Sequence, residues 1–165
     1  MLGDRLHGLI LSASSAGFAN RTPQDRARYL AERVAPITEQ GLTIAEYTPR
    51  LLKTMMAPTS PGPLVDRVVE VISAMRAETF LASMKAITAY DSRPALRTLT
   101  VPTLLVAGEH DPGCPPAGMR HMAELVPDAA YVEIEDAGHY AFAEQPDVFH
   151  ETTTAFIRRI QKIHA

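Results

Sequence analysis

The sequence has a single cysteine, Cys114, and no tryptophan among its 165 residues. One cysteine cannot form an internal disulfide, so a disulfide-stapled scaffold is excluded and a reducing, cytoplasmic setting is expected. No apolar run approaches the roughly 20 residues that span a bilayer, and residues 1–8 lack the apolar core of a signal peptide. We therefore expect neither export nor a membrane partner.

An excess of basic charge is also missing. Lys and Arg together number 16 against 19 Asp and Glu, which gives a formal net charge of -3. Without a basic excess, the sequence predicts no nucleic-acid partner. Apolar residues are plentiful at 46% of the chain, which is enough to form the core of a globular protein without cross-links.

Apolar patterning divides the chain into strands and helices. Strands are predicted at residues 9–11, 101–107 and 130–134, where short apolar runs end in loop-forming residues. The run VPTLLVA at 101–107 is apolar throughout, which is typical of a strand buried on both faces of a parallel sheet. Residues 21–90 carry four amphipathic stripes in succession, which predict four helices. The last helix is predicted to begin at Pro146, after a long polar loop (EDAGHYAFAEQP), with a buried stripe from Phe149 to Ile163.

Two residues capable of acid–base chemistry follow the last two predicted strands. Asp111 lies four residues beyond the second strand and His139 five residues beyond the third. Because ligands bind beyond the carboxyl ends of parallel strands, we expect these side chains to meet there. A carboxylate beside an imidazole fixes its tautomer and stabilises the imidazolium, and Gly138 is expected to let the loop turn sharply. The alternative is that Asp111 caps a turn and His139 is an ordinary surface histidine.

Other reactive or ligating side chains give weaker signals. Cys114 follows Asp111 closely and is either a nucleophile or, because no cation is placed to lower its pKa, a thiol that lines a cleft. His110 and His121 have no metal-ligand spacing to a partner and are predicted to lie on the surface. Four methionines are expected on the helices of residues 21–90 as core filler, with one or two of them near a substrate: Met55, Met56, Met75 and Met84.

The segments 101–116 and 130–157 closely resemble the C-terminal portion of the α/β-hydrolase superfamily. The family pattern there is a V-P-T-L strand, a G-x-x-D turn, a G-H loop and a glutamine-proline step before an amphipathic helix. The residues at matching places are Gly108, Asp111, Pro115, Gly138, His139, Glu144 and Pro146. The resemblance implies an α/β fold, the C-terminal part of an α/β-hydrolase, with three parallel strands, flanking helices and a four-helix cap. It assigns residues 1–20 and 91–165 to a partial core and residues 21–90 to the cap inserted in it.

Within the superfamily, the cap and the segment YDSRPAL are most similar to enol-lactone hydrolases and small-molecule esterases. The resemblance implies hydrolysis of an ester or lactone of a small acid, with Asp111 as triad acid, His139 as triad base, and neither a metal nor an organic cofactor. The family also needs a serine on a G-x-S-x-G elbow, and this sequence has none. Ser15 fits a looser A-x-S-x-G, but Gly17 to Pro23 is irregular where the elbow requires a helix.

The missing elbow leaves two further interpretations open. The chain is either a non-catalytic remnant or binding module, or one half of an enzyme that a separate N-terminal half completes. By itself it is expected to be inactive. The first strand, Leu9-Ile10-Leu11, is interior in the family and would lack its outer neighbour here, so we expect self-association or an N-terminal half to cover this edge.

Overall fold

A computed structural model of the chain describes residues 5–18, 21–58 and 63–163. The chain forms two compact units. The sheet unit consists of Met1–Ser15, Met55–Val65 and Arg93–Ala165, and the helical unit consists of Ala16–Thr54 and Asp66–Ser92.

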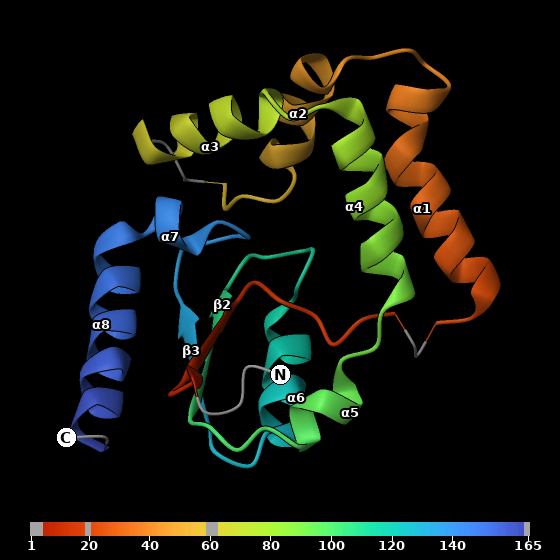
Figure 1. Cartoon of the computed structure of the whole chain (residues 1–165). Helices are drawn as coiled ribbons and strands as arrows, with labels where there is room; N and C mark the ends of the chain where they lie inside the picture. The colour runs from red at the N-terminus through yellow and green to blue at the C-terminus, as the bar shows by residue number, and fades with distance from the viewer. Residues whose placement is uncertain (1–4, 19–20, 59–62, 164–165) are drawn as a thin grey trace. The chain divides into compact units, whose positions relative to one another are not determined.

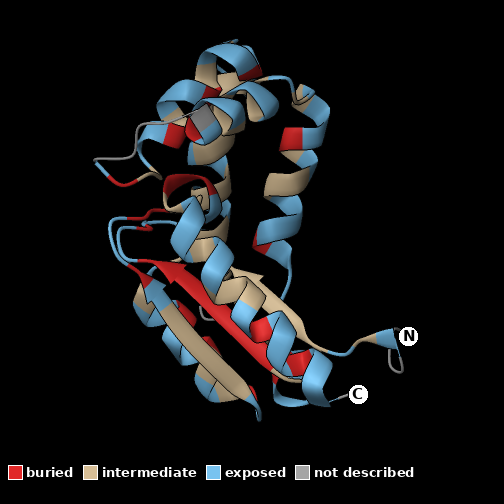
Figure 2. Cartoon of the chain, turned by 90° about the vertical axis from the view of Figure 1, so that its left-hand side faces the viewer, coloured by how far each residue is buried: buried red, intermediate tan, exposed pale blue. Residues whose placement is uncertain are grey.

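The sheet unit contains a parallel three-stranded sheet in the order β1-β2-β3. Its strands are β1 (Leu9–Ser12), β2 (Thr103–Gly108) and β3 (Ala129–Ile134). Every residue of β2 is buried, because this central strand has a neighbour on each side (Figure 2). β1 is half-buried along its length, and among the described residues no strand pairs with its outer side. The three predicted strands and their parallel arrangement are confirmed.

Helices cover both faces of the sheet. The helices of this unit are α5 (Arg93–Arg97), α6 (Pro116–Leu125), α7 (Ala141–Glu144) and α8 (Pro146–Ile163). α6 packs on β2 and β3 from one side, and α8 covers the other side (Figure 1). Val106 and Ile134 form a buried core with Phe156 and Ile160 of α8, and the fully buried Met119 anchors α6. This burial of apolar surface holds the sheet in place.

The helical unit is built from amphipathic helices. Its helices are α1 (Pro23–Thr38), α2 (Ile44–Lys53), α4 (Ala77–Ala89) and the part of α3 (Pro63–Ser73) from Asp66 onward. α1 packs against α4 and α2. Thr43 and Glu46 form a capping box that starts α2. α4 buries Phe80, whose ring lies edge-on to Tyr47 with 6.0 Å between centroids.

The predicted helices are present, together with two short helices that the apolar pattern does not predict. α5 lies in the segment before β2, and α7 lies inside the stretch predicted to be a long polar loop. That prediction was wrong because Ala141, Ala143 and Glu144 of α7 are buried. Ile163 was assigned to the buried stripe of the last helix, but it is 58% exposed because it stands in the final turn of α8, at the end of the helix.

The segment 55–65 belongs to the sheet unit, although the sequence placed it in the stretch assigned to the cap. Met55 and Met56 accordingly lie beyond the end of α2, and Met75 lies beyond the end of α3, so of the four methionines expected on helices only Met84, in α4, is on one. The assignment of a partial core and an inserted cap stays a prediction. Across the described ranges, no helix combines the length and the apolar character needed to cross a bilayer.

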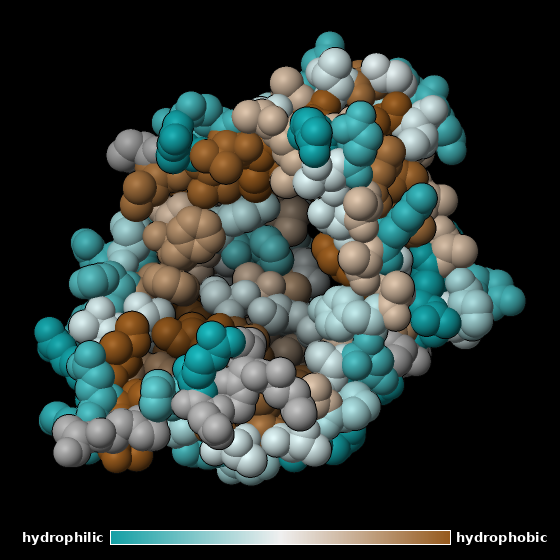
Figure 3. Space-filling model, viewed as in Figure 1, coloured by the Kyte–Doolittle hydropathy of each residue, from teal (hydrophilic) through white to brown (hydrophobic). Residues whose placement is uncertain are grey.

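An apolar hollow of about 150 Å³ lies beside β1. It is lined by Gly8, Ile10, Phe156, Ile157, Ile160 and Gln161. Figure 3 shows apolar side chains gathered in this region, beside α8. The outer side of the sheet thus presents apolar side chains next to the edge of β1.

Candidate active site

The loops that carry the predicted acid and base are joined through their backbones. The register of the parallel strands pairs Gly108, at the end of β2, with Ile134, at the end of β3. The N–H of Glu109 donates to the Ile134 carbonyl at 3.0 Å, and the N–H of His110 donates to the Ala137 carbonyl at 2.8 Å. The pairing therefore extends past the strands and fixes the separation of the two loops.

Asp111 and His139 are in contact at the ends of these strands. Oδ2 of Asp111 lies 2.8 Å from Nδ1 of His139, so the predicted hydrogen bond is confirmed. Oδ1 accepts the N–H groups of Gly113 at 2.7 Å and Cys114 at 2.9 Å. Burial raises the pKa of Asp111, but the hydrogen bonds from His139 and the two backbone groups outweigh it, and the pKa lies below its ordinary value. Asp111 therefore both caps a turn and orients the imidazole.

The His139 ring is held in one orientation and remains accessible. Its side chain is 22% exposed, while that of Asp111 is fully buried. Because the carboxylate can only accept, Nδ1 carries the proton, and Nε2 is the nitrogen that can exchange a proton with a reactant. The Tyr140 ring packs edge-on against the imidazole, with 5.1 Å between centroids. A buried carboxylate behind a partly exposed imidazole is the arrangement that a general base requires.

Two glycines allow three backbone segments to pack directly against each other around His139. A Cβ on Gly138 would lie 2.4 Å from the Met55 carbonyl oxygen, and one on Gly108 would lie 2.1 Å from the Gly138 carbonyl oxygen. The N–H of His139 donates to the same Met55 carbonyl at 2.8 Å. Gly138 does not have a positive φ, so the expectation that it provides a sharp turn is corrected: this position needs glycine for close approach.

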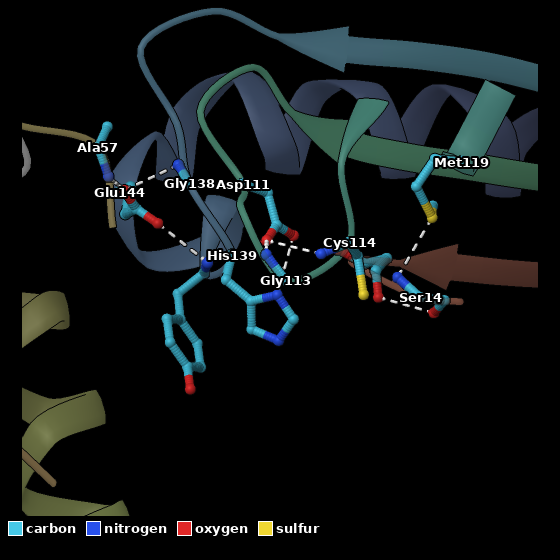
Figure 4. A network of polar contacts seen from close by, with 11 residues as sticks. Ser14, Ala57, Asp111, Gly113, Cys114, Met119, Gly138, His139 and Glu144 are labelled. Carbon is cyan, nitrogen blue, oxygen red and sulfur yellow. Dashed lines mark hydrogen bonds and ion pairs between the residues drawn. The ribbon is translucent and has the colours of Figure 1, made fainter. Parts of the chain in front are cut away.

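A buried carboxylate fixes the same loop from the other side. Glu144 is 8% exposed. Its Oε2 accepts the N–H groups of Ala57 at 2.8 Å and Gly138 at 2.9 Å, and its Oε1 accepts the N–H of Tyr140 at 2.9 Å. Figure 4 shows Glu144 between the segment at Ala57 and the loop at Gly138. The sequence matched Glu144 to a motif without giving it a role.

Two further side chains border the pair. Burial raises the pKa of Cys114 to about 12, with a contribution from the negative charge of Asp111. Cys114 is therefore a thiol at neutral pH, which favours the cleft-lining interpretation over the nucleophile. Burial, with Asp111 and Glu144 adding to it, raises the pKa of Tyr140 to about 12. Figure 4 shows the side chains of Cys114 and His139 pointing to the same side.

The comparisons with known proteins identify the fold. A family model described as alpha/beta hydrolase fold matches residues 66–146, which include both the acid and the base positions. A thermophilic esterase from Thermogutta terrifontis superposes on 95% of this chain with a TM-score of 0.77 and 29% sequence identity. The chain has the α/β-hydrolase fold.

This chain of α/β-hydrolase fold resembles enol-lactonases and esterases. It is 28% identical over 134 residues to 3-oxoadipate enol-lactonase 2 of Acinetobacter baylyi. This match covers 77% of this chain and 48% of that protein. The enol-lactonase structure from Burkholderia xenovorans has a TM-score of 0.77 and 25% identity over 94% of this chain and 57% of that one. The esterase match likewise covers 57% of the esterase. The chain thus spans about half the length of the relatives it matches.

Ser15 stands in a loop of the α/β-hydrolase chain, after β1. The described residues that follow it are not helical: Gly17 forms an isolated bridge with Asp91, and the next helix, α1, begins only at Pro23. The elbow needs a helix that starts directly after the serine. The local backbone therefore does not favour Ser15 as the nucleophile.

Among the residues that the structure describes, two groups of side chains have the composition of metal ligands. Asp111, Cys114 and His139 offer one ligand atom each within 4.8 Å of one another, but the Asp111 carboxylate already accepts hydrogen bonds from three N–H donors. Glu109, His110 and Asp136 form the second group, and all three are exposed. The expectation that His110 has no such partners is therefore wrong, because the backbone pairing beyond β2 and β3 brings Asp136 beside it.

Sequence reasoning missed the segment 55–57. Met55 and Ala57 hold His139 and Glu144 through backbone groups, and a backbone group leaves no signature in side-chain patterning. A weak signal was available in Glu144, a charged residue that directly follows the apolar run Ala141-Phe142-Ala143 and lies two positions before Pro146. A carboxylate that directly follows a short apolar run is a candidate for buried hydrogen bonding.

Proposed function

We propose that this chain supplies the acid and base of a hydrolase that opens an ester or lactone of a small carboxylic acid. The observation that carries the proposal is the 2.8 Å contact between Nδ1 of His139 and the buried, doubly anchored carboxylate of Asp111. The likeness to enol-lactonases and an esterase supports the bond class.

The reaction needs a serine nucleophile. Because this sequence contains no G-x-S-x-G elbow, we propose that another segment supplies the serine. The serine hydroxyl attacks the carbonyl carbon while Nε2 of His139 takes its proton. The tetrahedral intermediate collapses, the C–O bond to the alcohol or enol breaks, and the leaving oxygen takes the proton from His139. Water then attacks the acyl carbon and gives a proton to His139; the bond between the acyl carbon and the serine oxygen breaks, the serine oxygen takes the proton back from His139, and the acid is released. Asp111 stabilises the imidazolium in both steps.

A non-catalytic binding role is the second candidate. The absence of a G-x-S-x-G elbow from the sequence favours it. The two candidates differ in whether the imidazole ever meets an activated serine.

The test compares the chain alone with the chain mixed with a segment that carries the elbow portion of the Acinetobacter enol-lactonase. Turnover of p-nitrophenyl acetate and fluorophosphonate labelling are the readouts. We expect the chain alone to be no faster than free imidazole, and the mixture to hydrolyse the ester unless it carries His139→Ala. Turnover by the chain alone that Ser15→Ala abolishes would make Ser15 the nucleophile. No turnover in any mixture would support the binding role.

A further inference from the structure

Glu144 accepts backbone hydrogen bonds from the loop that carries His139, as a neighbouring strand would do. The residues on either side of His139, Gly138 and Tyr140, both donate their N–H groups to this one carboxylate. The N–H of His139 itself points the other way, to the Met55 carbonyl. Every backbone donor from 138 to 140 therefore has a fixed acceptor, although no strand is present at this point.

The carboxylate also joins two parts of the chain that are distant in sequence. Oε2 is shared between Gly138 and Ala57, which lies 87 positions before Glu144. The 55–57 segment and the His139 loop are thus tied twice, once by Glu144 and once by the bond from His139 to Met55. Hydrogen bonds from backbone N–H groups to an ionised carboxylate are stronger than neutral ones, and burial strengthens them further.

We propose that Glu144 is a positioning residue for His139, holding the loop backbone so that Nδ1 stays on Asp111. The proposal rests on the role given to His139 in the proposed function, but its geometric part stands on contacts within this chain. If the 138–140 backbone shifts, the imidazole moves with it, and a hydrogen bond of 2.8 Å is lost with a displacement of under 1 Å.

The chemistry of the site predicts that glutamine cannot replace this glutamate. Both oxygens of Glu144 accept, two N–H groups on Oε2 and one on Oε1. A glutamine amide has one acceptor oxygen and an NH₂ group that only donates. Whichever way it is placed, at least one backbone N–H faces another donor. Glu144→Gln therefore keeps the shape of the side chain but loses at least one of the three backbone hydrogen bonds.

The experiment uses proton NMR of the full chain. In the wild type, the His139 Nδ1 proton should give a low-field resonance, because its hydrogen bond to Asp111 protects it from exchange. In Glu144→Gln we expect this resonance to broaden beyond detection and the amide of Tyr140 to exchange about tenfold faster or more. Glu151→Gln, on the exposed side of α8, is the matched control and should change neither.

A low-field resonance and Tyr140 exchange that are unchanged in a folded Glu144→Gln chain would overturn the proposal. If that variant fails to fold, hydrogen exchange in the wild type decides. The amides of Ala57, Gly138 and Tyr140 must then be protected at least as well as that of His139, and free exchange at all three overturns the proposal. Both readouts concern the contact and not turnover, so a failure of the proposed hydrolase activity would leave them unaffected.

Discussion

Around His139, single residues are constrained mainly by the backbone of their neighbours. Gly138→Ala would place a Cβ 2.4 Å from the Met55 carbonyl and against the backbone of Met56 and Ala57, none of which is a flexible side-chain end. We expect it to lower the free energy of unfolding by about 3 kcal/mol, at the upper end of overpacking costs. Urea unfolding followed by circular dichroism measures this.

Gly118→Ala is the matched control for that substitution. Gly118 lies in α6, where a Cβ meets nothing within 4 Å. Alanine is the better helix former by up to about 1 kcal/mol, so this variant should be as stable as the wild type or more so. If both substitutions lowered the free energy of unfolding equally, the close packing around Gly138 would not be the cause of the loss of stability.

The Asp111 carboxylate links stability to pH. Its pKa in the folded chain lies below the ordinary value of 3.8, because hydrogen bonds to its charged form outweigh burial. A depressed pKa contributes stability that is complete above the unfolded value and is lost as the pH falls through the folded value. We expect the free energy of unfolding to fall more steeply below pH 3.8 in the wild type than in Asp111→Asn. Parallel slopes in urea titrations at several pH values would contradict this.

At the scale of elements, α2 depends on its N-terminal cap. The Thr43 hydroxyl accepts the N–H of Glu46, and the Glu46 carboxylate accepts the N–H of Thr43 at 2.8 Å. Thr43→Ala should cost about 1 kcal/mol of unfolding free energy. Thr38→Ala, where the hydroxyl bonds the Val34 carbonyl at the end of α1, should cost far less. A loss at Thr43 no larger than at Thr38 would argue against the capping box as a source of stability.

Elements with a strong period were predictable from the sequence, and those held by tertiary contacts were not. β2 was found because a short, mainly apolar run that ends in loop-forming residues is typical of a buried strand, and α8 because its apolar positions recur at helical spacing. α7 escaped because four residues are too few to show a period. Its helix forms where Glu144 is drawn into the interior by three backbone donors, an effect that no local pattern reports.

The candidate site was predictable to the same extent. Asp111 and His139 could be paired from sequence because both follow strands that the pattern reveals, and parallel strands end at one edge. The Met55 carbonyl and the Ala57 amide could not be placed there, since only the folded chain brings residues more than 80 positions away beside His139. Gly138 was noticed for the wrong physical reason, because the sequence cannot distinguish a turn glycine from a close-packing one.

At the scale of the whole molecule, the outer edge of β1 is the feature that we expect to determine whether the chain associates in solution. The N–H groups of Leu9 and Ala13 donate to carbonyls of Pro102 and Val106, on the β2 side. Backbone groups alternate in direction along a strand, so those of Ile10 and Ser12 point outward. Next to them lies the apolar hollow beside β1. Outward-pointing backbone N–H groups at the edge of a sheet, beside apolar surface, are a template for association.

We therefore expect the chain to associate through β1, with a second copy as the partner when it is purified alone. Light scattering at micromolar concentration should give a mass above the 18.0 kDa of one chain. Ser12→Pro removes an outward N–H and leaves the bonds to β2, so it should shift the mass toward one chain, whereas Ser12→Ala should not. On association, the amides of Ile10 and Ser12 should become protected from exchange. A monomer at every concentration, or equal masses for the two variants, would mean that the β1 edge does not pair.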